Sequence, residues 1–217
     1  MAVFRLVDEL FFPDPLLSNE DGLLAIGGDL SVERLLLAYQ NGIFPWFEND
    51  DDILWWSPDP RLILKLEDFK VSKSMKRILK SKKFTVKMDT CFTQVVESCS
   101  SISRTGEQGT WITEGMKKSF LSLHHLGIAH SVEIFENNIL VGGLYGLEIG
   151  QVFCGESMFH KVSNASKVAL FYLVKYLKEN NFSFIDAQMP TDHLKSMGAI
   201  EINKLQFLNL LKKATNF

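Results

Sequence analysis

Cysteine is scarce in this chain, and long apolar runs are absent. The 217 residues include three cysteines, Cys91, Cys99 and Cys154, an odd number without the spacing of a disulfide framework. No stretch approaches the roughly eighteen consecutive apolar residues of a membrane span. The start of the chain also lacks the apolar core of a secretory signal. These absences favour reduced thiols, no membrane association and a cytoplasmic location.

The chain also lacks the motifs of several enzyme classes. It contains no Walker phosphate loop and no Gly-x-Gly-x-x-Gly dinucleotide fingerprint. Its five histidines form no His-x-x-x-His pair and its cysteines no Cys-x-x-Cys pair, so we expect no metal site. The segment Gly155–Phe159 is not a Gly-x-Ser-x-Gly nucleophile elbow. Phosphate-driven and redox chemistry are therefore disfavoured, and no cofactor is expected.

Acidic residues are missing from one segment, Lys70 to Lys87, although the whole chain has a net charge of −3. Ser72 is expected to cap a helix there. Basic residues recur along it at helical spacing and continue just beyond it: Lys73, Lys76, Arg77, Lys80 and Lys83. Stacked like charges repel one another, and a nucleic-acid phosphate backbone would offset that repulsion. The alternative is an ordinary solvated helix face.

Proline divides the chain. Five of the six prolines lie in the first sixty residues, which we interpret as a small loop-rich N-terminal domain (1–60) with one helix between Ser31 and Gly42. Its two aromatic and proline-rich runs, 43–47 and 54–60, are expected to form no regular element. They would instead form a packed seam, the usual place of tryptophan, or a binding wall.

The second part of the chain, 61–217, has mixed α and β patterns. Three strands are expected at 130–135, 139–147 and 151–159, then a helix from about 163 to 180 and a strand at 182–188. This order predicts an α+β fold of the GCN5-like N-acyltransferase (GNAT) type, with a mainly antiparallel sheet flanked by helices. Acyl-CoA enzymes of that type hold pyrophosphate on a glycine-rich turn before this helix. The turn here, Phe159–Ala165, has no glycine, so we expect a donor other than CoA.

Polar residues occur inside two segments that are otherwise apolar and resemble strands. Glu156 lies within Phe153–Phe159, and Asp186 and Gln188 lie within Phe182–Gln188. A carboxylate inside a sheet is costly unless it is paired or takes part in chemistry. Asp186 and Gln188 are two residues apart and are expected to share one face of their strand. If the two runs pair, the three residues are the candidate catalytic group.

The chain resembles the leucyl/phenylalanyl-tRNA–protein transferases. The resemblance rests on motifs that follow in order over most of the chain: Gly22–Leu30, Ala38–Phe47, Leu54–Arg61, Thr110–Thr113, Phe153–Phe159 and Ile185–Gln188. It implies an enzyme that moves leucine or phenylalanine, and methionine less well, from aminoacyl-tRNA to a protein with an N-terminal Arg or Lys. The product is a degradation substrate of the N-end rule pathway. We expect a monomer.

The resemblance also implies roles for residues. Asp186 would hydrogen-bond Gln188 and polarise its carbonyl oxygen toward the acceptor amine, and Glu156 would orient the donor. Whether Gln188 accepts the proton or only positions the amine stays open. Trp46, Trp111, Leu144, Phe153, Ser157 and Met158 would form the aminoacyl pocket. Leu144 stands where the family leads us to expect methionine. The basic helix residues and Lys83 would bind tRNA phosphates.

Two other interpretations remain. The first is a related peptidyl transferase that acts on cell-wall precursors, which the tryptophan and proline runs of residues 43–61 disfavour. The second is a tRNA-binding protein without catalysis, which would need neither Glu156 nor the Asp186 and Gln188 pair.

Overall fold

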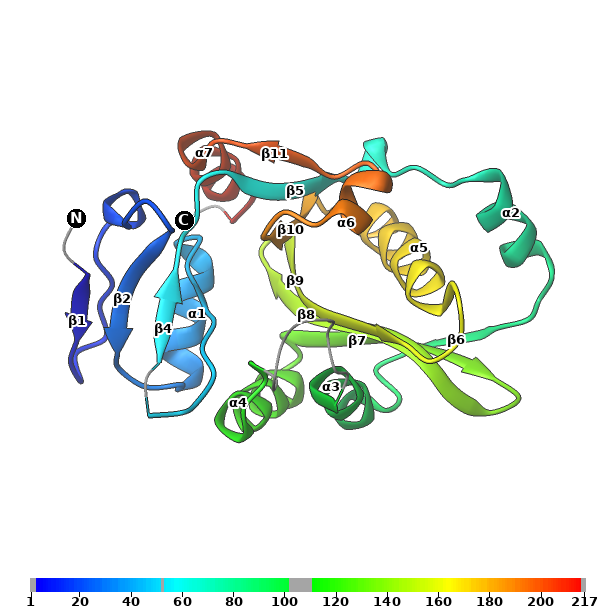
Figure 1. Ribbon diagram of the computed structural model, residues 1–217, viewed down its shortest axis with the longest axis horizontal. Coiled ribbons are helices and arrows are strands. Elements are labelled where there is room, and N and C mark those ends of the chain that lie inside the picture. Colours follow the sequence, from blue (N-terminus) through cyan, green and yellow to red (C-terminus); the bar gives the residue numbers. More distant parts are fainter. Residues whose placement is uncertain (1–2, 52, 102–110, 216–217) are drawn as a thin grey trace.

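The computed structural model describes residues 3–51, 53–101 and 111–215. The sequence also favours a polar loop at 100–109, and this segment lies almost wholly outside the described residues. The N-terminal part forms a four-stranded sheet in the order β1-β2-β4-β3, beside helix α1 (Val32–Gln40) (Figure 1). Its strands are β1 (Phe4–Leu6), β2 (Leu23–Gly27), β3 (Phe44–Pro45) and β4 (Leu54–Trp56), and a 3-10 helix, η1, covers Pro15–Leu17.

The expectation that the proline-rich aromatic runs form no regular element is wrong. Phe44–Pro45 and Leu54–Trp56 pair with each other as antiparallel strands. Pro45 is accommodated because β3 is the edge strand of its sheet, where one side needs no backbone donor. The Trp55 indole is buried, and it donates a hydrogen bond to the Gly27 carbonyl at 2.8 Å.

The remainder of the chain builds a seven-stranded sheet in the order β11-β5-β10-β9-β8-β7-β6. Its neighbours are antiparallel except for β10 and β9, which run parallel. The strands are β5 (Arg61–Lys65), β6 (Thr85–Met88), β7 (Ala129–Glu136), β8 (Ile139–Ile149), β9 (Val152–His160), β10 (Phe184–Gln188) and β11 (Ile200–Ile202). The expected α+β class and the antiparallel meander are confirmed, and the strand after α5 lies beside β9 in the same sheet.

Helices cover both faces of this sheet (Figure 1). They are α2 (Lys73–Lys80), α3 (Phe92–Ser101), α4 (Glu114–His125), α5 (Ala165–Glu179), α6 (Asp192–Ser196) and α7 (Lys204–Thr215), with a 3-10 helix, η2 (Leu66–Asp68). One apolar cluster packs α5 against the sheet, and the other joins α1, α3, α4 and α7 to both sheets. Because that second cluster crosses from one sheet to the other, a domain boundary near residue 60 stays a prediction.

Glycine allows the crossover helix to approach the sheet closely. A Cβ on Gly142 of β8 would lie 2.5 Å from the Cβ of Ala165, the first residue of α5. The start of α5 therefore lies directly over β8, the central strand of the meander. None of the helices in the described residues is long and apolar enough to cross a membrane. All three cysteines are free thiols.

Candidate active site

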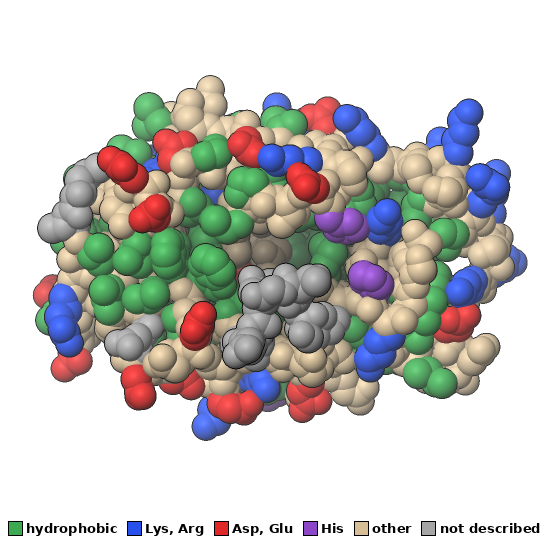
Figure 2. Space-filling view, viewed as in Figure 1, with side chains coloured by type: hydrophobic (Ala, Val, Ile, Leu, Met, Phe, Trp, Pro, Cys, Tyr) green, Lys and Arg blue, Asp and Glu red, His purple; other side chains and the backbone are tan. Residues whose placement is uncertain are grey.

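The predicted site residues surround one cavity of about 460 Å³ between β8, β9, β10 and α5. Figure 2 shows it as a hollow near the centre of one face, bordered on one side by apolar side chains. Its lining contains eight of the nine residues predicted as catalytic or pocket-forming: Trp46, Trp111, Leu144, Phe153, Glu156, Ser157, Met158 and Gln188. The exception is Asp186, whose carboxylate does not face the cavity. The cavity wall is mostly apolar and ends at the polar pair of Glu156 and Gln188.

Glu156 owes its position to a bulge in β9. Tyr145 of β8 pairs with Ser157 and the next residue, Gly146, pairs with Gly155, so Glu156 is the extra residue. Bulges of this kind redirect a side chain relative to regular strand alternation. The Glu156 carboxyl accepts a hydrogen bond of 2.9 Å from the Gln188 side-chain amide nitrogen. Since Nε2 is engaged in this way, the Gln188 Oε1 atom is left as the acceptor of the pair.

A second irregularity separates Asp186 from Gln188. Ile63 and Leu62 of β5 pair with Asp186 and Gln188, so Ala187 has no partner across the ladder. Gln188 also has a φ of +60°, a left-handed conformation that costs energy for a residue with a Cβ. The expectation that Asp186 and Gln188 share one face is therefore wrong, because the irregularity interrupts the alternation. Gln188 faces the cavity and the Asp186 carboxylate turns away from it.

Asp186 instead forms a buried ion pair with Arg61 of β5. The Arg61 guanidinium donates two hydrogen bonds, Nε to Oδ1 at 2.8 Å and Nη2 to Oδ2 at 2.7 Å. Asp186 Oδ1 also accepts the backbone N–H of Gln188 at 3.0 Å. Asp186 thus contacts Gln188 through the main chain, and the expected polarisation of the side-chain carbonyl by Asp186 is absent. The guanidinium is held between the rings of Phe44 and Phe207, at 4.7 and 4.5 Å from their centroids.

The protonation of Glu156 follows from its burial. Burial raises the pKa of Glu156 to about 8, against smaller lowering effects of the hydroxyl of Tyr39 and the amide of Gln188. Tyr39 comes from α1, and burial together with Glu156 raises its own pKa well above 10. Glu156 is therefore a neutral acid at pH 7 in the free protein. With Asp186 neutralised by Arg61, neither carboxyl offers a free negative charge to a cationic acceptor.

Arg61 and Tyr39 have no role that was predicted from the sequence. Arg61 is the last residue of the motif Leu54–Arg61 and directly precedes the apolar run Leu62–Leu64. A buried arginine at this position requires an acidic partner. Asp186, an acid within another apolar run, could have been identified as that partner. Tyr39 gave no such signal, because an aromatic residue on an amphipathic helix is ordinarily part of the core.

Helix α2 lies at the end of the molecule opposite the N-terminal sheet (Figure 1). It carries four of the predicted basic residues, which we call the basic stripe: Lys73, Lys76, Arg77 and Lys80. Ser72 caps it as expected, and the buried Met75 anchors its apolar side. Lys73, Lys76, Arg77 and Lys80 form no ion pair with the described residues. Lys83 lies beyond the helix and pairs with Glu136 at 3.4 Å.

Family profiles and curated relatives that match nearly the whole chain all carry the name of one family. The family profile "Leucyl/phenylalanyl-tRNA protein transferase" matches residues 63–212, and the profile of its N-terminal domain matches residues 28–59. The transferase named for that family in Flavobacterium johnsoniae is 49% identical, over 97% of this chain and 99% of its own. The one in Syntrophobacter fumaroxidans is 52% identical, over 97% and 90%. A solved aminoglycoside acetyltransferase from a soil metagenome is 13% identical, over 61% and 89%, with a TM-score of 0.41, too low to support an argument. The two profiles and the relatives at about half identity place the chain in the leucyl/phenylalanyl-tRNA–protein transferase family.

Proposed function

We propose that this protein moves a leucyl or phenylalanyl group, and methionyl less well, from aminoacyl-tRNA to the N-terminal Arg or Lys of an acceptor protein. It would act as a monomer and mark the acceptor for degradation. The observation that carries the proposal is an apolar cavity that ends at the Gln188 and Glu156 pair, in a chain of this family. The apolar wall suits an unbranched or aromatic side chain, and the polar end suits the reacting ester and amine.

The aminoacyl ester is already activated, so the enzyme has to orient the amine and manage one proton. The neutral acceptor nitrogen attacks the ester carbonyl carbon, an amide bond forms, and the bond to the ribose oxygen breaks. The leaving oxygen takes a proton, and the attacking nitrogen loses one. Gln188 Oε1 accepts a hydrogen bond from the attacking amine and so positions it. A neutral amide is too weak a base to keep the proton, which passes to the ribose oxygen.

The remaining residues hold this geometry. Arg61 pairs with the Asp186 carboxylate and keeps it turned away from the cavity, and Asp186 fixes the backbone of Gln188. Glu156 fixes the side-chain amide of Gln188 and contacts the aminoacyl-adenosine end of the donor tRNA. Trp46 lines the pocket, and its carbonyl accepts a hydrogen bond of 2.7 Å from the Trp56 indole. The basic stripe of α2 would bind phosphates of the tRNA body.

The test uses labelled leucyl-tRNA and three peptides that differ only in the first residue, Arg, Lys or Ala. Transfer to the Arg and Lys peptides alone is the expected result. Binding of the tRNA with no transfer to any peptide would exclude the enzyme and favour a tRNA-binding protein. Gln188→Glu is the matched variant: it keeps the shape, places a second carboxyl against Glu156, and should lower kcat more than tRNA affinity.

A further inference from the structure

Three basic side chains lie at one rim of the cavity, on three different elements. His193 of α6 lines the cavity itself. Lys167 lies one helical turn before Leu170, a lining residue of α5, and therefore on the same side of that helix. His160 lies two residues after Met158 on β9, so both side chains point to the same face of the sheet. We call His160, Lys167 and His193 the cationic rim.

The described part of the chain does not neutralise this rim. None of the three residues forms an ion pair there, and the first turn of α5 contains no acidic residue. Asp192, next to His193, acts electrostatically on Lys195. Burial lowers the pKa of His193, and the nearby charges of Lys167 and His160 lower it further, so the three groups are close enough to repel one another. An anion at the rim would relieve that repulsion.

The chemistry of the two substrates says which anion fits. In the proposed reaction the cavity holds the aminoacyl ester of the terminal adenosine, and the nearest anion on the donor is the 5′-phosphate of that nucleotide. The acceptor has a cationic N-terminal residue, which the rim would repel. The rim also lies on the side of the cavity toward α2. Figure 2 shows histidine and basic side chains between the hollow and the basic right end of the molecule.

We propose that the cationic rim binds the 5′-phosphate of the terminal adenosine of the donor tRNA. Lys167 supplies a fixed charge, and His160 and His193 supply imidazole N–H donors. The donor then enters over α5 and α6, with its body toward α2, and the acceptor approaches from the side of Trp46 and Trp111. This inference rests on the proposed function, because it takes the aminoacyl group to occupy the cavity.

The test compares two minimal donors that differ by one phosphate: the 3′-leucyl ester of adenosine and the 3′-leucyl ester of adenosine 5′-monophosphate. We expect the wild-type KM to be roughly tenfold lower for the phosphorylated donor, the worth of a charge-assisted hydrogen bond. Lys167→Ala should abolish the difference, and Lys167→Arg should keep it. Lys175→Ala, on an exposed part of the same helix, is the matched control and should behave as wild type.

Equal loss for both donors in Lys167→Ala, or an unchanged difference, would overturn the proposal. Binding of AMP and adenosine without the amino acid, followed by calorimetry, gives a readout that needs no transfer. AMP should bind the wild type roughly tenfold more tightly than adenosine and should lose that advantage in Lys167→Ala. Equal binding of the two to the wild type would also overturn the proposal. Failure of the proposed function would appear separately, as absence of transfer from intact leucyl-tRNA.

Discussion

Arg61 and Asp186 form a bidentate ion pair buried between two neighbouring strands, with N–O distances of 2.8 and 2.7 Å. Each side chain is almost fully shielded from solvent. The pair joins β5 to the strand that carries Gln188, and the rings on either side of the guanidinium belong to the N-terminal sheet and to α7. Four elements of the chain, β3, β5, β10 and α7, thus converge behind Gln188, the proposed catalytic residue.

Arg61→Met should lower the free energy of unfolding by about 3–5 kcal/mol, because it leaves the Asp186 carboxylate buried and unpaired. Removing both charges in Arg61→Met with Asp186→Asn should recover most of that loss. Urea denaturation of the two single variants and the double variant measures the coupling. Arg5→Met, at an exposed position, controls for loss of an arginine. If the effects of the single variants simply add, the pair is not coupled.

Glu156→Gln should make the protein more stable at alkaline pH and less active. The folded pKa of Glu156, about 8, lies above its ordinary value of 4.5, so the unfolded chain releases the proton first as pH rises. Wild-type stability therefore falls between about pH 4.5 and 8 by an amount on the order of 4–5 kcal/mol, and the glutamine variant escapes that loss. Unfolding free energies at pH 5, 7 and 9 measure it.

The same substitution should remove an ionisation near pH 8 from the profile of kcat/KM, which reports groups of the free enzyme. Asp192→Asn is the control, since that acid is exposed and lies outside the cavity. A profile that keeps the ionisation in Glu156→Gln would assign it to another group.

The elements with strong patterns were predictable from the sequence. The meander, α5 and the capped helices at Ser31, Ser72 and Thr113 all follow from periodicity and capping residues. The strands of the N-terminal sheet were missed because several are only two or three residues long, and an edge strand tolerates a proline that a pattern treats as a break. Local propensity says little about such short pairings.

The membership of the candidate site was also predictable, but its internal contacts were not. Alternation along a strand holds only while the register is regular, and Glu156 and Ala187 lie at the two irregularities of β9 and β10. The partner of Asp186 lies 125 residues earlier, in β5. An ion pair that links such distant positions depends on the order of strands in the sheet, which no local pattern encodes.

Lys76→Ala with Lys80→Ala should weaken binding of tRNA and leave kcat at saturating tRNA nearly unchanged. Each lysine that contacts a phosphate contributes about one to the slope of log affinity against log salt, so the slope should fall in magnitude by about 2. Lys212→Ala with Lys213→Ala, an exposed pair on α7, is the matched control. Binding measured at four salt concentrations gives the slope. An unchanged slope would mean that α2 does not contact tRNA phosphates and is only a solvated helix.

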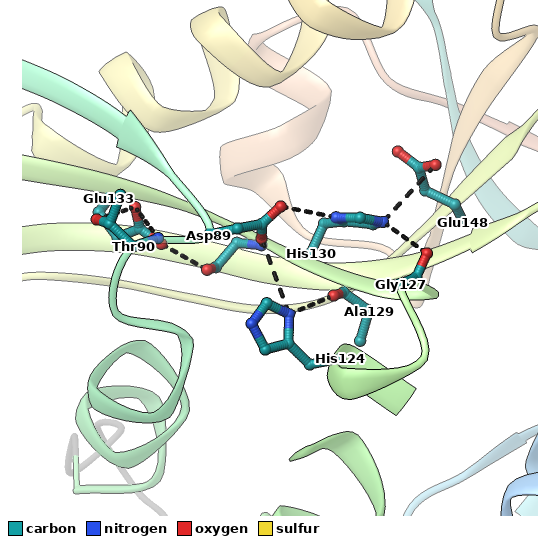
Figure 3. Close-up of polar contacts among 9 residues, drawn as sticks. Asp89, Thr90, His124, Gly127, Ala129, His130, Glu133 and Glu148 are labelled. Carbon is teal, nitrogen blue, oxygen red and sulfur yellow. Dashed lines mark hydrogen bonds and ion pairs between the residues drawn. The ribbon is translucent and has the colours of Figure 1, made fainter. Parts of the chain in front are cut away.

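His130 should make the stability of the protein depend on pH above neutrality. Its Nδ1 lies 2.8 Å from Asp89 Oδ2, and its Nε2 lies 3.8 Å from Glu148 Oε2 (Figure 3). The hydrogen bond with Asp89 raises the pKa of His130, and the charge of Glu148 adds to this effect against the cost of burial. Burial alone would raise the pKa of Asp89, but its hydrogen bonds with His130 and Ser131 lower it.

Because the folded pKa of His130 is raised, its stabilising effect is complete below the unfolded pKa of about 6.5 and is lost as pH rises through the folded pKa. The pair is partly exposed, so the loss should be about 1 kcal/mol or less. His124 Nδ1 also lies 4.0 Å from Asp89 Oδ1. His130→Gln should flatten the dependence of unfolding free energy on pH between 6 and 9. His125→Gln, at an exposed position, should leave that dependence unchanged. Equal slopes in both variants would mean that a group other than His130 causes the dependence.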